Sequence, residues 1–147
     1  MEDGNNKSVL INGPISGSFI NQCIKDESDR NSGAELIFLG RVRADIIDGK
    51  VIKSIEYSAY DQMVEQEAEK IKTIIRDKYN QVNNILIYHG TGEIKAGEVS
   101  LLVVVFSEHR KQGFEALTET VELIKKHFPV WKKEIFEDGS YIWTENI

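Results

Sequence analysis

The sequence predicts a single α+β domain over residues 1–147, with a mixed or antiparallel sheet, two main helices and a C-terminal hairpin. Three observations predict this class. Two long segments carry apolar residues at helical spacing, several shorter runs have the composition of strands, and turn residues separate a last pair of strands. The helices are too few for a doubly wound sheet, and a length of 147 residues is typical of one domain.

Short elements are expected at the start of the chain. Residues 8–12 have the character of a strand, and residues 25–33 are polar and are expected to form a loop. Between them, after Pro14, a short helix is expected. Its apolar side consists of Phe19, Ile20, Cys23 and Ile24.

Two strands and a turn are expected next. Residues 34–42 form an apolar run that predicts a buried strand, and Asp48-Gly49 is a turn signal. Residues 55–60 alternate, with Ile55, Tyr57 and Ala59 on one side, so this segment predicts a half-buried strand.

Two long helices are expected, each with an apolar stripe. Asp61 is a candidate N-cap of the first helix. The second spans about residues 114–128, and Pro129 ends it, because proline disfavours helical geometry in the preceding residue. The two stripes consist of Val64, Ala68, Ile71 and Ile75, and of Phe114, Leu117, Val121, Ile124 and Phe128.

The remaining strands lie in the second half of the chain. Residues 85–88 predict a strand, and the glycines at 90, 92 and 97 predict a loop after it. Residues 98–107 contain the longest apolar run and predict a central strand that is buried on both faces. Residues 132–136 and 141–144, joined by a turn at 137–139, predict the hairpin.

Composition excludes several classes of function. The net charge of −6 disfavours binding to nucleic acid or anionic lipid, and no apolar run approaches the ~20 residues of a membrane-spanning helix. A single cysteine, Cys23, cannot form an internal disulfide and is typical of a reducing compartment, so a cytoplasmic location is expected. Residues 109–133 are nevertheless basic, with six Lys or Arg and three acids.

Lys125 is the leading candidate for chemistry. It falls about 20° beyond the edge of the second apolar stripe, next to Phe114. An amine at the margin of an apolar stripe is partly desolvated, which lowers its pKa from about 10.4 and makes it a better nucleophile near neutral pH. The alternative is that Lys125 only extends its aliphatic stem along the core rim.

An anion pocket is predicted from three basic pairs. Arg41 and Arg43 follow one buried strand, and His109 and Arg110 follow another, where sheet proteins often bind ligands. Guanidinium groups match the geometry of phosphate, and histidine donates to anions or moves protons. Convergence of these residues with Lys125 and Lys132 is the hypothesis; solvated strand ends are the alternative.

No metal site and no resident cofactor is expected. The three histidines, His89, His109 and His127, lack the spacing of metal ligands and have no cysteine pair beside them. Residues 90–93 lack the third glycine of a dinucleotide-binding loop.

With these residues identified, the chain resembles the molybdopterin synthase large-subunit family over residues 34–145. Each block is short, but their order and spacing together are highly specific. The matching blocks are Phe38-Leu39-Gly40-Arg41-Val42-Arg43, Ile55-Glu56-Tyr57 with Tyr60, Ile87-Tyr88-His89 with Gly92-Glu93 and Gly97-Glu98, Ser107-Glu108-His109-Arg110 with Phe114-Glu115-Ala116, and Lys125 with Pro129-Val130-Trp131-Lys132-Lys133-Glu134.

This resemblance implies an α/β hammerhead fold and a homodimer within a heterotetramer. Each large subunit of the family binds a small ubiquitin-like sulfur carrier, whose C-terminal Gly-Gly ends in a thiocarboxylate. The substrate is cyclic pyranopterin monophosphate, which receives two sulfurs and becomes molybdopterin. By motif, Lys125 and Lys132 correspond to the essential lysines, and Arg43, His109 and Arg110 to the anion pocket, with Arg41 a weaker candidate.

The residues agree with an external sulfur donor, because Cys23 is expected to be an inert core thiol. Family members usually continue into a charged tail that serves the neighbouring subunit, whereas this sequence stops four residues after Trp143. Two alternatives remain: a non-catalytic anion-binding regulatory module, and an acyl- or sulfur-handling enzyme of the same fold with another substrate.

Overall fold

The computed structural model describes residues 8–26 and 29–145, and these contain three helices and eight strands. Helices α2 and α3 have 18 residues each and are the two main helices predicted. The elements in chain order are β1 (Leu10–Asn12), α1 (Gly17–Lys25), β2 (Ala34–Arg41), β3 (Ile46–Ile47), β4 (Lys50–Ala59), α2 (Asp61–Lys78), β5 (Val82–Lys95), β6 (Val99–Ser107), α3 (Arg110–His127), β7 (Val130–Phe136) and β8 (Tyr141–Glu145).

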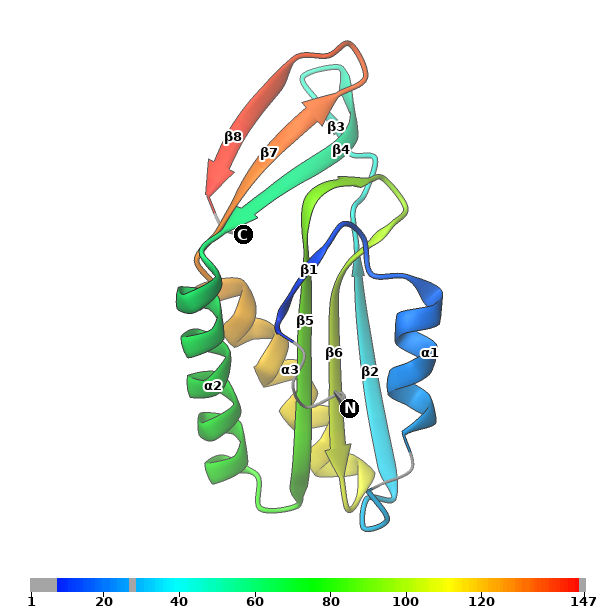
Figure 1. Cartoon of the computed structure of the whole chain (residues 1–147), viewed down its shortest axis with the longest axis vertical. Coiled ribbons are helices and arrows are strands. Elements are labelled where there is room, and N and C mark those ends of the chain that lie inside the picture. Colours follow the sequence, from blue (N-terminus) through cyan, green and yellow to red (C-terminus); the bar gives the residue numbers. More distant parts are fainter. Residues whose placement is uncertain (1–7, 27–28, 146–147) are drawn as a thin grey trace.

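The strands form one mixed sheet, which confirms the predicted α+β class. Its order is β2-β6-β5-β4-β7-β8, with antiparallel neighbours throughout. Strand β1 adds to β5 in parallel, and the short β3 adds to β4. Figure 1 shows the sheet in two parts: β2, β6 and β5 lie in the lower part beside the helices, and β4, β7 and β8 form the upper part.

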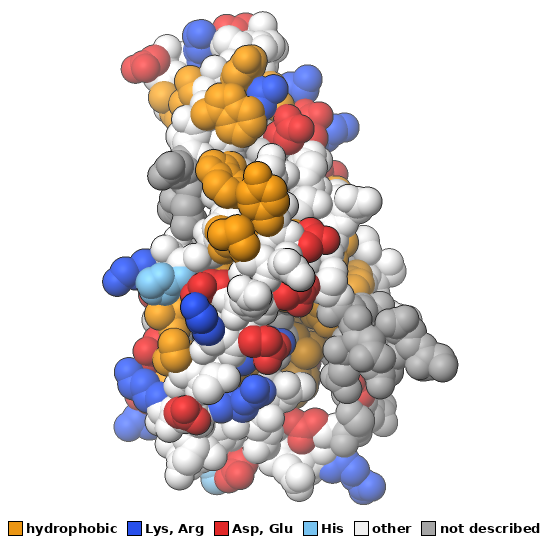
Figure 2. Space-filling model, turned by 60° about the vertical axis from the view of Figure 1, so that its left-hand side comes forward, with side chains coloured by type: hydrophobic (Ala, Val, Ile, Leu, Met, Phe, Trp, Pro, Cys, Tyr) orange, Lys and Arg blue, Asp and Glu red, His pale blue; other side chains and the backbone are white. Residues whose placement is uncertain are grey.

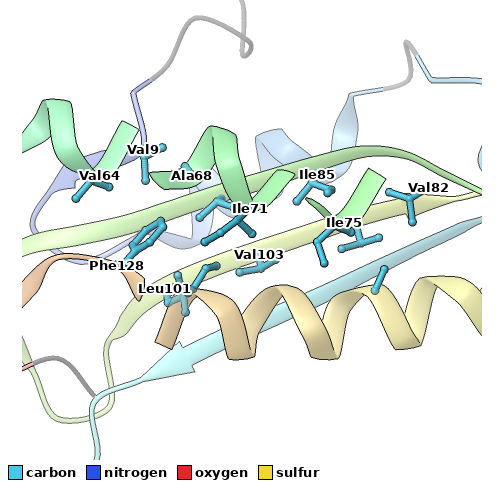
Figure 3. Packing of buried hydrophobic residues seen from close by; sticks show 14 of the residues in the cluster. Val9, Val64, Ala68, Ile71, Ile75, Val82, Ile85, Leu101, Val103 and Phe128 are labelled. Carbon is cyan, nitrogen blue, oxygen red and sulfur yellow. The ribbon is translucent and has the colours of Figure 1, made fainter. Parts of the chain in front are cut away.

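Strand β6 is the centre of the lower part, and every one of its residues is buried. Alternate side chains face opposite sides of a strand. Leu101, Val103 and Val105 pack in the same core as α2 and α3, as Figure 3 shows for part of that cluster. Leu102 and Val104 pack in a second core with α1. Helices on both faces therefore explain the predicted two-sided burial.

Strand β5 corrects the prediction of a loop at residues 90–97. It continues through Gly90 and Gly92 to Lys95, pairing first with β6 and then with β4. A Cβ at Gly90 would lie 2.5 Å from the carbonyl oxygen of Gly13, so glycine here permits close approach of the chain beside β1. Gly92 has φ +79°, a conformation that favours glycine. The glycines thus shape one long strand between the two parts of the sheet.

Helix α3 begins four residues before the predicted start, and its buried face is rotated. The buried residues are Gly113, Ala116, Thr120 and Ile124, whereas Phe114 is 58% exposed. A Cβ at Gly113 would collide with the side chain of Leu36, so only a small residue lets the helix approach β2. The expectation that Phe114 lies in the apolar stripe is therefore wrong.

Two turns agree with the sequence. Asp48 and Gly49 have φ of 51° and 78° and join β3 to β4 as an Asp-Gly hairpin turn. Strands β7 and β8 pair antiparallel and form the predicted C-terminal hairpin. Among helices in the described parts of the chain, none combines the length and the apolar composition needed to span a membrane.

Exposed aromatic side chains gather in the upper half of the molecule, where Figure 2 shows a band of hydrophobic atoms. The rings of Tyr60 and Trp131 contact edge to face at 5.7 Å, and the amine of Lys133 lies 4.2 Å from the ring of Tyr141. Trp143 is 58% exposed. We call Tyr60, Trp131, Tyr141 and Trp143 the aromatic patch.

Candidate active site

Lys125 and Lys132 flank the junction between α3 and β7. Lys125 lies in the last turn of α3, which ends because Phe128 takes an extended conformation before Pro129. Phe128 is almost fully buried, and its N–H donates to the carbonyl of Ile124 at 3.0 Å. The buried ring fixes where the helix ends and the strand begins, and so fixes the relation between the two lysines.

Both lysines line a small cavity of about 50 Å³, which we call the inner cavity. Its walls come from β4, β5, β6, α3 and β7, and they combine apolar side chains with four kinds of polar group. The lining residues are Tyr57, His89, Ser100, Leu101, Ile124, Lys125, Phe128, Val130 and Lys132.

A wider groove of about 560 Å³ adjoins the inner cavity, and the two share Tyr57, Ser100, Lys125 and Lys132. We call it the outer groove. Its other lining residues come mainly from the end of β2 and from the upper part of the sheet. They are Phe38, Leu39, Gly40, Arg41, Val42, Arg43, Asp45, Ile52, Ile55 and Glu134.

The amine of Lys125 lies in an environment that disfavours its charge. Burial is the main cause that lowers its pKa, and the nearby cations of Lys132 and Arg43 lower it further, against an opposing effect of Glu122. Partial desolvation of Lys125 was expected from its place beside Phe114. Because Phe114 is exposed, the inner cavity, and not that ring, is the origin.

His89 forms the polar floor of the inner cavity. It is 8% exposed, its Nδ1 lies 2.7 Å from the carbonyl oxygen of Gly90, and its ring contacts the ring of Tyr57 edge to face at 4.9 Å. Burial lowers the pKa of His89 to about 4, and Lys125 and Lys132 act in the same direction. The imidazole is therefore neutral at physiological pH.

Tyr57 connects His89 to the lysines. It lies opposite Lys132 in the β4–β7 pairing, so the two side chains share one face of the sheet. Burial raises the pKa of the Tyr57 hydroxyl, a hydrogen bond with Ser100 opposes that effect, and the charge of Glu134 adds to the rise. The hydroxyl consequently remains protonated and can donate a hydrogen bond.

The structure places Arg41 and Arg43 at the outer groove. The guanidinium of Arg41 is engaged, since its Nη1 donates to the carbonyl of Gly97 at 2.6 Å. Arg43 makes a 3.1 Å ion pair with Asp45, but its side chain is 80% exposed. Arg43 is therefore the guanidinium more available to an incoming anion.

His109 and Arg110 lie away from the inner cavity and the outer groove. His109 is the N-cap of α3 and Arg110 its first residue, whereas Lys125 is in the last turn. At a rise of about 1.5 Å per residue, Arg110 and Lys125 are separated by about 22 Å along the helix. Convergence of all three basic pairs is therefore not achieved within one chain.

Sequence reasoning missed three lining residues, namely Tyr57, His89 and Ser100, as members of the site. In the sequence, His89 and Tyr57 belong to the blocks that resemble the family, but nothing in their spacing assigns either residue a role in the site. A signal was present, since His89 directly follows the apolar run at residues 85–88 of a strand, where a buried polar side chain calls for a partner. Within residues 8–26 and 29–145, no three His, Cys, Asp or Glu side chains group as metal ligands.

Comparison with known proteins places this arrangement in a family. A sequence model described as MoaE protein matches residues 12–127. A molybdopterin synthase catalytic subunit of Pyrococcus abyssi is 39% identical over 142 residues, covering 97% of this chain and 93% of the relative. The chain spans only 36% of the length of similarly named proteins from Drosophila sechellia and Drosophila melanogaster.

Solved structures agree with the fold. Molybdopterin synthase from Staphylococcus aureus superposes with a TM-score of 0.81 and 30% identity, covering 93% of this chain and 96% of that one. A subunit in a complex of subunits 1 and 2 of molybdopterin-converting factor from Helicobacter pylori gives a TM-score of 0.76 at 24% identity, covering 92% and 88%. Sequence and fold together show that this chain belongs to the MoaE protein family.

Proposed function

We propose that this chain is the catalytic subunit of molybdopterin synthase. In this reaction, sulfur passes from the C-terminal thiocarboxylate of a small ubiquitin-like carrier to cyclic pyranopterin monophosphate, and two such transfers form the dithiolene of molybdopterin. The observation that carries the proposal is that Lys125 and Lys132 line the same cavity, beside a groove that Arg43 also lines. A cationic recess in a chain of net charge −6 suits an anionic substrate.

The lysines supply the chemistry in this proposal. Lys125, with its lowered pKa, has a larger share of neutral amine than a lysine of ordinary pKa, so it attacks or activates the reacting carbon or thioacyl group. Lys132 donates protons or neutralises developing negative charge. Arg43, with a contribution from Arg41, binds the substrate phosphate at the outer groove.

A protein partner is part of the proposal. The solved Helicobacter pylori relative is a complex of two different subunits, which supports a small partner subunit here. The aromatic patch adds support, because Tyr and Trp are enriched at protein interfaces. A cytoplasmic location is proposed with it, on the lone cysteine of the sequence.

His109 and Arg110 retain a proposed role at the phosphate through a second copy of the chain. Because they lie about 22 Å from Lys125 along α3, contact with the same substrate requires a neighbouring subunit that presents its own pair. That arrangement fits the predicted homodimer within a heterotetramer, and a two-fold axis would complete both sites at once.

Reconstitution tests the proposal directly. The purified chain is mixed with thiocarboxylated carrier and cyclic pyranopterin monophosphate, and molybdopterin is measured. We expect product with the wild type and loss of product with Lys125→Ala or Lys132→Ala. A regulatory module would bind anions without turnover, and unchanged precursor in the presence of competent carrier would contradict the proposal.

A further inference from the structure

His89 has an unused hydrogen-bonding atom at the floor of the inner cavity. A carbonyl oxygen only accepts hydrogen bonds, so the 2.7 Å contact with Gly90 requires a proton on Nδ1 of His89. In a neutral ring the other nitrogen, Nε2, then carries only a lone pair. Among the described residues, the Nδ1 contact is the one hydrogen bond of the His89 side chain, so no donor meets Nε2. Nε2 is also not sealed off, because Thr144 Oγ1 is the only side-chain nitrogen or oxygen atom of the described residues that is both fully buried and without a partner.

The His89 ring is held in place, so it cannot easily rotate to give Nε2 another hydrogen-bond partner. The backbone N–H of His89 donates to the carbonyl of Val9 at 2.8 Å, and β5 is held between β1 and β6 at this residue. The ring itself contacts Tyr57 edge to face. Protonation is also disfavoured, because burial and the charges of Lys125 and Lys132 lower the pKa of His89.

The inner cavity therefore presents two complementary kinds of group. Lys125 and Lys132 offer cations and N–H donors, and His89 offers a neutral acceptor. A ligand that satisfies all three carries an anion and, close to it, an N–H. The last residue of a peptide has this combination, since its terminal carboxylate or thiocarboxylate adjoins its own amide N–H.

The size of the inner cavity favours the same ligand. Its volume of about 50 Å³ holds roughly four water molecules, which suits the end of an extended chain and not a fused heterocycle. The outer groove, at about 560 Å³, has the room for a heterocycle and adjoins the inner cavity at both lysines. The two reactants would thus meet at Lys125 and Lys132.

We infer that His89 is a further substrate-contacting residue, whose Nε2 accepts the amide N–H of the carrier's C-terminal residue and so positions the terminal thiocarboxylate between Lys125 and Lys132. This inference rests on the proposed function for the identity of the carrier. The contact is made in the bound complex and involves no proton transfer. His89 therefore acts on carrier affinity and placement, and it is a positioning residue in the sulfur transfer.

The test removes each partner of this hydrogen bond in turn. Carrier protein is prepared with its natural C-terminal glycine or, by chemical ligation, with sarcosine, whose N-methyl group replaces the amide hydrogen. Dissociation constants are measured by calorimetry for wild type, His89→Leu and His89→Gln, with His127→Gln on the exposed end of α3 as the matched control. The experiment with wild type and sarcosine carrier requires no variant and so does not depend on the folding of any variant.

We expect wild type to bind the sarcosine carrier on the order of threefold to tenfold more weakly than the glycine carrier, as for one lost hydrogen bond. His89→Leu should bind both carriers with the same reduced affinity, whereas His89→Gln, which keeps an acceptor, should recover part of the discrimination. Non-additive losses of this kind are the signature of a direct contact. His127→Gln should behave as wild type.

Other outcomes overturn the inference. Equal losses for wild type and His89→Leu on the sarcosine carrier would show that Nε2 does not meet that N–H. A raised KM for the pterin with unchanged carrier affinity in His89→Leu would assign the acceptor to the heterocycle. If wild type binds no carrier and makes no product, the proposed function fails as well. If wild type binds the carrier and makes product, but the effects of the His89→Leu and sarcosine substitutions on affinity are independent, only this inference fails.

Discussion

Tyr57 lies directly opposite Lys132 in the antiparallel pairing of β4 with β7, and its ring contacts His89 of β5. Three strands therefore hold three polar side chains of the site in one fixed relation. Lys125 reaches the same cavity from a helix, immediately before the chain enters β7. The site is thus built mainly on regular elements, which position side chains more accurately than loops do.

Removal of the Lys125 amine should abolish turnover without unfolding the protein. Lys125→Ala is expected to lower kcat by on the order of 10²- to 10⁴-fold, the range for loss of a group that moves protons or activates the substrate. Lys126→Ala is the matched control, because Lys126 lies on the same turn and is exposed like Lys125, but lines neither the inner cavity nor the outer groove. Comparable losses in both variants would contradict a specific role for Lys125.

The amine of Lys125 should reduce the stability of the folded protein at neutral pH. Burial lowers the pKa of Lys125, so the folded state disfavours its charge relative to the unfolded chain. Lys125→Met should therefore raise the melting temperature at pH 7. The gain should shrink as pH rises through the folded pKa and should vanish above about 10.4, where lysine is neutral in both states. A gain that is independent of pH would show that packing, and not charge, is responsible.

His89 should make the folded protein less stable as the pH falls from 7 to 4. Its folded pKa of about 4 lies below the unfolded value of 6.5, so between these values only the unfolded state binds the proton. The free energy of unfolding should fall by about 3 kcal/mol as pH drops from 7 to 4. His89→Gln lacks this contribution, and urea unfolding of both proteins at several pH values measures the difference. Parallel pH profiles for the two proteins would be evidence against a buried neutral imidazole.

Arg43 should act on substrate binding and not on folding. Its side chain is largely exposed and its only ion pair among the described residues is with Asp45 on the surface. Arg43→Ala should raise the KM for cyclic pyranopterin monophosphate on the order of tenfold, as for loss of a hydrogen bond to a charged group, with little change in melting temperature. Added salt should weaken binding by wild type more than by the variant. Arg30→Ala, an exposed arginine away from the groove, is the control.

Variants of His109 and Lys125 should restore each other's activity when the two chains form a mixed dimer. If a neighbouring copy presents its own pair to the lysines, Lys125→Ala and His109→Ala chains are each inactive alone, yet a mixed dimer contains one intact site. Random exchange of equal amounts should restore up to about a quarter of wild-type activity. Activity restored by mixing supports the shared site; inactive mixtures that contain verified mixed dimers would assign these two residues to another function.

Much of the fold was predictable because it depends on local patterns. The buried strand β6, the two main helices and the Asp48-Gly49 turn follow from apolar runs, helical spacing and turn chemistry. Strand β5 was predicted too short, because a glycine in the sequence is equally consistent with a loop and with a strand that lies very close to another segment of the same chain. That approach, to Gly13, is a tertiary fact.

The residues of the site divide in the same way. The sequence by itself determined that Lys125, Lys132 and Arg43 are present in the order and spacing of the family, and it located the basic segment of an acidic chain. Only the tertiary structure decided which of them meet. Side chains from five separate elements line the inner cavity, so His89 and Tyr57 join the lysines while His109 and Arg110 remain at the other end of α3. The spacing of residues in the sequence predicts the faces of one helix or strand at a time. Which side chains meet in the cavity depends on how elements distant in the sequence pack together.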